Sequence, residues 1–169
     1  MNINIISAIN QNLNKASQLL EAISDYEYTN ESIGPYFSSI GSHIRHSLDF
    51  FSCLIDGLDS NHIDLTKRTR DEVLSTNRMA AQNYIHDLQQ TLLTYGDITT
   101  NYLIHVSDDL GQGIIKVDYT LESILAHANS HALHHYAIIG YILHHLGLTI
   151  EIPGFGYNPT TPVQKRKGI

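Results

Sequence analysis

The sequence predicts an all-α fold, a four-helix bundle with a small β-hairpin inserted between helices three and four. Apolar residues recur every three or four positions through four long stretches of the chain, which is the period of a helix that buries one face. Between the third and fourth stretches the period changes to two, around a turn that contains glycine, which is typical of paired strands.

The first two helices are predicted from their apolar seams. The segment YEYTNESIG separates them, and Pro35 lies where the first turn of a helix accepts proline, so the second helix is expected to begin there. The first seam consists of Ile6, Ile9, Leu13, Ala16, Leu20 and Ile23. The second consists of Phe37, Ile40, Ile44, Leu48, Phe51, Leu54 and Leu58.

The third helix is expected to start with Thr66 as its N-cap and to end near Tyr95. Its apolar stripe is weaker and consists of Val73, Leu74, Ala81, Ile85, Leu88 and Leu92. The segments TTNYLIHVS and GIIKVDYT then alternate like two strands around DDLGQG. Thr120 is expected to cap a fourth helix that continues through Leu146 and ends at Gly147.

Length and composition suit one domain over residues 1–169, with an irregular tail over 148–169 that holds three of the four prolines. The net charge of −7 argues against a nucleic-acid partner, and the basic segment QKRKG is expected to be a solvated tail. Cys53 is the single cysteine, which excludes an intrachain disulfide and favours a reducing compartment. With no signal peptide and no apolar run of membrane length, we expect a cytoplasmic protein without a membrane partner.

Histidine is concentrated near the end of the chain, where SHALHHYAIIGYILHHLG holds five of the eleven histidines. On the predicted fourth helix, His131 and His135 lie one turn apart on or beside the apolar face, with His127 at its margin. Such a pair is a common way for one helix to supply two imidazoles to one metal ion, although buried histidines also serve as hydrogen-bonded core residues.

The third ligand is expected from SIGSHIRHSLDFF in the second helix. His43 lies at the edge of the apolar face of that helix, whereas His46 points most of the way round the back. The predicted metal ligands are therefore His43, His131 and His135. His46 and His127 are the alternative ligands, or neighbours that hydrogen-bond to the ligands.

Two stretches resemble the DinB/YfiT-like superfamily, the DinB family, whose members are classed as metalloenzymes. HALHHYAIIG is similar to the fourth-helix signature, in which the first and last histidines of H-x-x-H-H bind metal, here His131 and His135. IGSHIRHSLDFF is similar to the second-helix signature, which fits His43 better than His46. The chain departs from the family where Tyr136, Ala137 and Ile138 replace a common Gly-Gln pair. The resemblance implies metal binding, and some relatives are thiol S-transferases.

Three neutral imidazoles leave coordination positions open, which favours a divalent-metal-dependent enzyme over a structural metal site. Zinc, nickel and iron(II) all suit nitrogen ligands. The ion could activate water for hydrolysis or a substrate thiol for transfer, so the expected substrate is a small molecule such as a thiol. The sequence assigns no catalytic residue, because H-E-x-x-H and Glu-x-x-His are both absent.

Other residues on or near the predicted site have simpler interpretations. Asp49 and Glu122 are expected to be solvated or to hydrogen-bond to the ligands. Arg68 and Arg70 could hold an anionic substrate, but a solvated turn explains them more simply. Two further hypotheses stay open: a non-catalytic metal-binding or ligand-binding bundle, and a structural bundle. A homodimer is the default assembly.

Overall fold

The computed structural model describes residues 3–95 and 103–162. The protein is mostly helical with a small three-stranded sheet, which confirms the predominance of helix expected from the sequence. In chain order the elements are α1 (Ile3–Ala22), α2 (Asp25–Thr29), α3 (Ile40–Leu58), β1 (His62–Asp64), η1 (Leu65–Lys67), α4 (Val73–Thr76), α5 (Arg78–Thr94), β2 (Ile104–Asp109), β3 (Ile114–Tyr119) and α6 (Leu121–His145).

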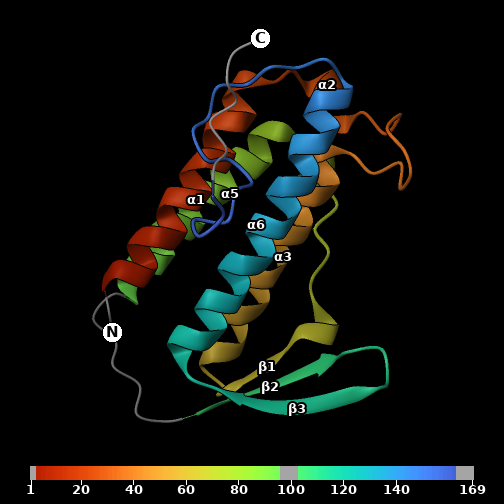
Figure 1. The fold of residues 1–169 in the computed structure, drawn as a ribbon. Helices are drawn as coiled ribbons and strands as arrows, with labels where there is room; N and C mark the ends of the chain where they lie inside the picture. Colours follow the sequence, from red (N-terminus) through yellow and green to blue (C-terminus); the bar gives the residue numbers. More distant parts are fainter. Residues whose placement is uncertain (1–2, 96–102, 163–169) are drawn as a thin grey trace.

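The long helices form two neighbouring pairs. α3 packs along α6, α1 packs along α5, and the core lies between the pairs (Figure 1). Every residue of the apolar seam predicted for the first helix is buried in this core, with exposed fractions from 0 to 4%. The sheet lies across the ends of α3 and α6, at the bottom of Figure 1.

The sheet has the strand order β1-β2-β3. β2 and β3 are antiparallel, and Val106 lies opposite Val117. β1 adds to β2 in parallel, and Ile63 lies beside Val106. The sequence did not indicate β1, because a three-residue strand with one fully buried residue, Ile63, is too short to show a period. Residues 99–102 of the predicted first strand lie outside the described residues.

Two predicted helix starts are wrong, and both errors have a local cause. α3 begins after Ser39, whose side chain accepts the backbone N–H of Ser42, while Pro35 lies in a turn ahead of the helix. α5 begins after Asn77, whose side chain accepts the N–H of Ala80. The carboxylate of Asp64 accepts the backbone N–H of Thr66, so Thr66 is part of η1 and caps no long helix.

The two ends of α6 agree with the sequence prediction. The Thr120 side chain accepts the N–H of Ser123 and caps α6, and Gly147 follows the helix with a φ of 74°. Residues 148–162 contain no helix or strand, and Phe155 from this segment stacks on Tyr136. Residues 163–169, which include the basic QKRKG segment, lie outside the described residues.

In the parts of the chain that the structure describes, none of the helices combines the length and the apolar character needed to cross a membrane.

Candidate metal centre

Three histidines from two helices converge where α3 packs along α6. One ring nitrogen of each of His46, His131 and His135 lies within 4.8 Å of the other two. The ring centroids are 5.0 Å apart for His46 and His131, 4.6 Å for His46 and His135, and 4.7 Å for His131 and His135. The spacing of four residues along α6 places the last two rings one above the other, as the sequence predicts.

The structure places His46, one of the alternative ligands considered from the sequence, in this group. His43 lies outside the group of three, and its ring packs against His135 with a centroid distance of 5.2 Å. The two Nδ1 atoms of His43 and His135 are 3.0 Å apart, and Nε2 of His43 is 2.8 Å from Oγ of Ser38. Both distances are those of hydrogen bonds.

The prediction that His46 points away from the buried face is wrong. α3 is buried continuously from Ser47 to Phe51, because α6, α5 and the sheet contact it from several sides. Phe50, one turn after His46, is 1% exposed, although it does not belong to the apolar seam predicted from the sequence. Residues four apart on a helix share a face, so the burial of Phe50 extends the buried face of α3 to His46.

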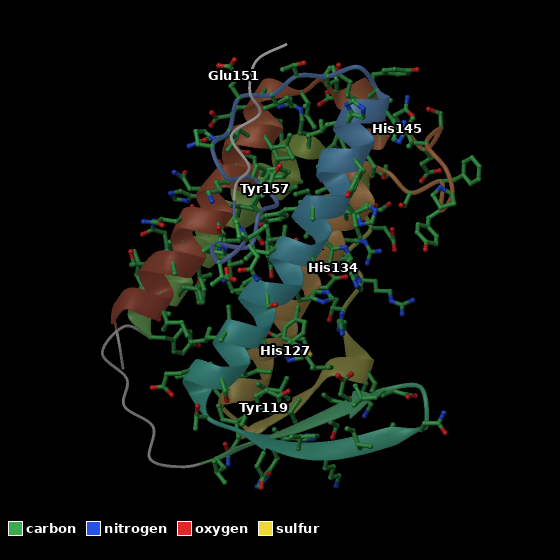
Figure 2. The ribbon with its side chains drawn as sticks, in the orientation of Figure 1. Tyr119, His127, His134, His145, Glu151 and Tyr157 are labelled. Carbon is green, nitrogen blue, oxygen red and sulfur yellow. The ribbon has the colours of Figure 1, made fainter. Side chains whose placement is uncertain are left out.

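Two further histidines of α6, His127 and His134, are neighbours of this group. His127, labelled in Figure 2, packs edge-on against Phe50 and stacks on Tyr119, with ring centroids 5.0 and 6.0 Å away. His134, also labelled, is exposed. Neither belongs to the group formed by His46, His131 and His135, so His127 is a neighbour of that group and not a member of it.

The environment keeps the converging imidazoles neutral. Burial, followed by the nearby Arg68, lowers the pKa of His46 to about 4. Burial, followed by His46, lowers the pKa of His131 to about 4. Burial, followed by His131, lowers the pKa of His135 to about 3. All three rings are therefore in the unprotonated form that metal ions require.

One ring nitrogen of the group lacks a partner. Nε2 of His131 is buried and, within the described residues, has no hydrogen bond. Buried polar atoms are rarely left in this state, because the lost hydration is not replaced. A cation held by the three rings would accept the lone pair of this nitrogen. The donor set is nitrogen only, so the residues fit zinc, nickel or iron(II).

The nearest acid on α3 is already paired. Asp49 follows His46 by three residues, is 3% exposed and accepts a hydrogen bond of 2.7 Å from Nη1 of Arg45. Burial raises the pKa of the Asp49 carboxyl, and Arg45 opposes that effect. Glu122 lies in the first turn of α6, nine residues before His131.

A cavity of about 380 Å³ opens beside the histidines. Its wall is formed by α3, α6, η1 with the loop that follows it, and the end of β2. Its lining residues are His46, Asp49, Leu65, Thr66, Arg68, Arg70, Asp108, Asp109 and His131.

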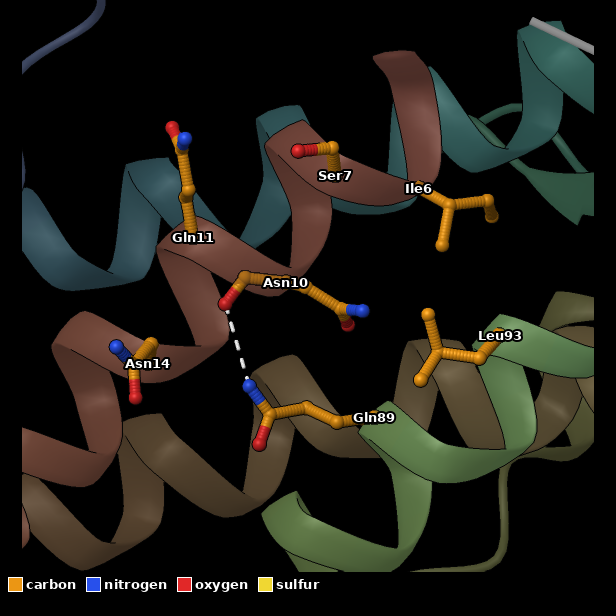
Figure 3. A pocket seen from close by; sticks show the side chains of 7 residues that line it. All are labelled: Ile6, Ser7, Asn10, Gln11, Asn14, Gln89 and Leu93. Atoms are coloured by element: carbon orange, nitrogen blue, oxygen red, sulfur yellow. Dashed lines mark hydrogen bonds between the residues drawn. The ribbon is translucent and has the colours of Figure 1, made fainter. Parts of the chain in front are cut away.

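A second cavity, of about 390 Å³, lies between α1 and α5 (Figure 3). Its lining is made of amide, hydroxyl and aliphatic side chains, and Nε2 of Gln89 donates to the backbone oxygen of Asn10 across 3.2 Å. None of these side chains titrates or binds metal well, so the cavity beside the histidines is the better candidate site. The residues that line the second cavity are Ile6, Ser7, Asn10, Gln11, Asn14, Gln89 and Leu93.

Comparison with known proteins gave one finding. A sequence model described as the DinB family matches residues 2–157, which is most of the chain and includes all the histidines discussed above. No curated protein and no solved structure matched the chain.

Proposed function

The chain belongs to the DinB family, and on that premise we propose that it is a divalent-metal-dependent enzyme whose ion is held by His46, His131 and His135. The observation that supports this most directly is the group of three converging imidazoles, in which the buried Nε2 of His131 has no other partner in the described chain. In this proposal His46 takes the place that the sequence predicted for His43.

His43 has a positioning role in the same proposal. With Nδ1–H of His135 donating to Nδ1 of His43, the Nε2 lone pair of His135 is free for the ion. Nε2–H of His43 then donates to Oγ of Ser38. The chain of two hydrogen bonds sets the tautomer and the orientation of the His135 ring, as carboxylates and carbonyls do in many metal sites.

The proposed reaction is hydrolysis or thiol transfer on a small molecule such as a thiol. When bound, the ion supplies a Lewis acid that lowers the pKa of a water or a thiol. The histidines hold the ion, the packed ring of Phe50 limits access of bulk water, and the adjoining cavity admits the substrate. We also propose that α1, α3, α5 and α6 correspond to the four-helix bundle of the family, with β2 and β3 inserted.

One observation favours a second candidate, a non-catalytic metal-binding or ligand-binding protein. Asp49, the buried carboxylate closest in sequence to His46, is bound to Arg45 and poorly placed to accept a proton from a substrate. The metal site would be the same in both candidates. Turnover of a broad panel of thiols and esters by the metal-loaded protein separates them.

The metal content of untagged protein tests the proposal. We expect close to one divalent ion per chain in the unmodified protein, and loss of the ion in His46→Ala, His131→Ala and His135→Ala. His43→Ala is the matched control on α3. It should keep the ion with an affinity lower by roughly 10- to 100-fold. The proposal is wrong if the unmodified protein binds no divalent ion, and the ligand set is wrong if His43→Ala loses the ion while His46→Ala keeps it.

A further inference from the structure

We infer that the cavity beside the three histidines binds an oxyanion of the substrate, a carboxylate or a phosphate, through Arg68 and Arg70. The inference rests on the proposed function, because it identifies the class of molecule that this site accepts. It starts from the cavity itself, which Arg68, Arg70, His46 and His131 all line.

Within the described residues, only the Nε of the Arg68 guanidinium donates a hydrogen bond. Its Nε donates to the backbone oxygen of Leu65 across 3.0 Å, and its guanidinium carbon lies 5.2 Å from the ring centroid of Phe50. The Phe50 ring also packs against His131, with a centroid distance of 5.2 Å. Phe50 therefore links the guanidinium to the histidine group. The residues described here give the terminal nitrogens of Arg68 neither a hydrogen bond nor an ion pair.

Arg70 supplies a second cation from the same loop. Its side chain is exposed, lines the cavity, and forms no ion pair within the described part of the chain. Both arginines are close enough to His46 to add to the lowering of its pKa, after the larger effect of burial. Two guanidinium groups that form no ion pair with the described residues thus face a cavity that also reaches the histidines.

The acids that line the cavity have partners of their own. Asp49 is paired with Arg45 at 2.7 Å. Oδ1 of Asp109 accepts the backbone N–H groups of Gly111 and Gly113 in the hairpin turn, and Oδ1 of Asp108 accepts the N–H of Asp109. The carboxylates of Asp108 and Asp109 repel an anion. An oxyanion in the cavity is therefore expected next to Arg68 and Arg70.

This arrangement favours substrates that carry a negative charge. A guanidinium binds carboxylate or phosphate oxygens through two parallel hydrogen bonds, and its planar shape sets the direction of approach. A substrate held in this way by its anionic group would present its other end to the histidines. The structure thus favours small anionic thiols or esters over neutral ones.

The first test uses the full chain without metal. The arginine Nε–H signals are followed by nitrogen-15 NMR while acetate, and separately inorganic phosphate, replaces chloride at constant ionic strength. We expect saturable shifts of the Arg68 and Arg70 signals, and the anion that saturates at the lower concentration identifies carboxylate or phosphate as the preferred group. Absence of a saturable shift with both anions would overturn the inference.

Matched variants locate the binding. Arg68→Gln and Arg70→Gln should each weaken anion binding by roughly tenfold or more, because each removes a charge-assisted hydrogen bond. Lys67→Gln removes a neighbouring cation whose side chain is 82% exposed and pairs with Asp64 at 3.3 Å, so it should leave binding unchanged. An equal loss in all three variants would indicate general electrostatic attraction and contradict the site. Arg70→Gln changes an exposed side chain and should fold normally.

The second test separates this inference from the proposed function. Cobalt(II) is added to the metal-free chain, and the absorption of the ion is followed with 3-mercaptopropionate and with its neutral amide. We expect the carboxylate to bind at least roughly tenfold more tightly, with the preference lost in Arg70→Gln and kept in Lys67→Gln. If cobalt binds and the two thiols bind equally, the arginine site is wrong and the metal site stands. If cobalt does not bind, the proposed function fails, and the anion titration decides the arginine site alone.

Discussion

His43 and His46 differ by three positions on one helix, yet the structure gives them different surroundings. His46 meets the two rings of α6 in the group of three, whereas the ring of His43 packs against His135 and is hydrogen-bonded to Ser38. In the proposed site, the residue that the sequence favoured as a ligand is therefore the hydrogen-bond partner of a ligand. Support from outside the set of ligands often determines how well a metal site works.

The link from Ser38 through His43 leads to a prediction for metal affinity. Ser38→Ala should weaken metal binding, by no more than about tenfold, because it removes only the partner of the His43 ring. The double variant Ser38→Ala/His43→Ala should bind as His43→Ala does, since Ser38 acts through His43. Competition with a chromophoric chelator measures the affinities. Additive losses in the double variant would show that Ser38 acts by another route.

The buried ion pair on α3 leads to a prediction for stability. Arg45→Met leaves the Asp49 carboxylate, which is 3% exposed, without its partner. We expect a loss of about 3 kcal/mol in the free energy of unfolding, measured by urea denaturation of the metal-free protein. The double variant Arg45→Met/Asp49→Leu should recover most of that loss, because no buried charge remains. A single variant as stable as the parent would show that Asp49 is not held by this pair.

At the scale of elements, close backbone contacts fix the position of α3. A Cβ added at Gly41 would overlap the backbone oxygen of Ser75 in α4, and one added at Gly57 would lie 2.6 Å from the backbone oxygen of His62 in β1. At these two glycines the backbone of α3 thus lies directly against the backbone of α4 and of β1. The contact of α3 with α6, and with it the position of His46, depends on this close packing.

Gly41→Ala should therefore lower the free energy of unfolding by roughly 1–3 kcal/mol, because the clash is with backbone and a side chain cannot rotate away from it. Gly140→Ala is the matched control. Gly140 lies inside α6, and nothing is within 4 Å of an added Cβ. That change should raise the free energy of unfolding by about 0.5–1 kcal/mol. Equal effects of the two substitutions in urea denaturation would contradict the close seating of α3.

For the whole molecule, metal binding is expected to stabilise the fold, because the three histidines converge only when α3 and α6 are packed. Zinc at about 100 times its dissociation constant should add about 2.7 kcal/mol to the free energy of unfolding. For a chain of this size, that is a rise of roughly 5–10 °C in Tm. Chelation should reverse the rise.

Differential scanning calorimetry with and without zinc measures this effect. His131→Ala should show no rise, whereas His86→Ala, which changes a histidine with an exposed side chain on α5, should behave as the unmodified protein does. A zinc-dependent rise that persists in His131→Ala would place the stabilising ion elsewhere in the chain.

Local patterns in the sequence account for much of the fold. The apolar seam of α1, the Thr120 cap of α6 and the helical glycine stop at Gly147 each depend on residues within a turn or two of one another. The stacked pair His131 and His135 is local in the same sense, since four-residue spacing on any α-helix aligns two side chains. These features are determined by the sequence alone.

The tertiary structure decided which histidine of α3 completes the group. That outcome depends on how α3 is rotated and packed against α6. The elements that bury Phe50 and that approach Gly41 closely determine this rotation, and they lie outside α3 in the sequence. It also decided that β1 pairs with β2 and that the loop after η1 brings Arg68 to the cavity. Helix period and caps are set by neighbours in the chain, whereas the meeting of side chains from different elements is set by packing, which no single segment encodes.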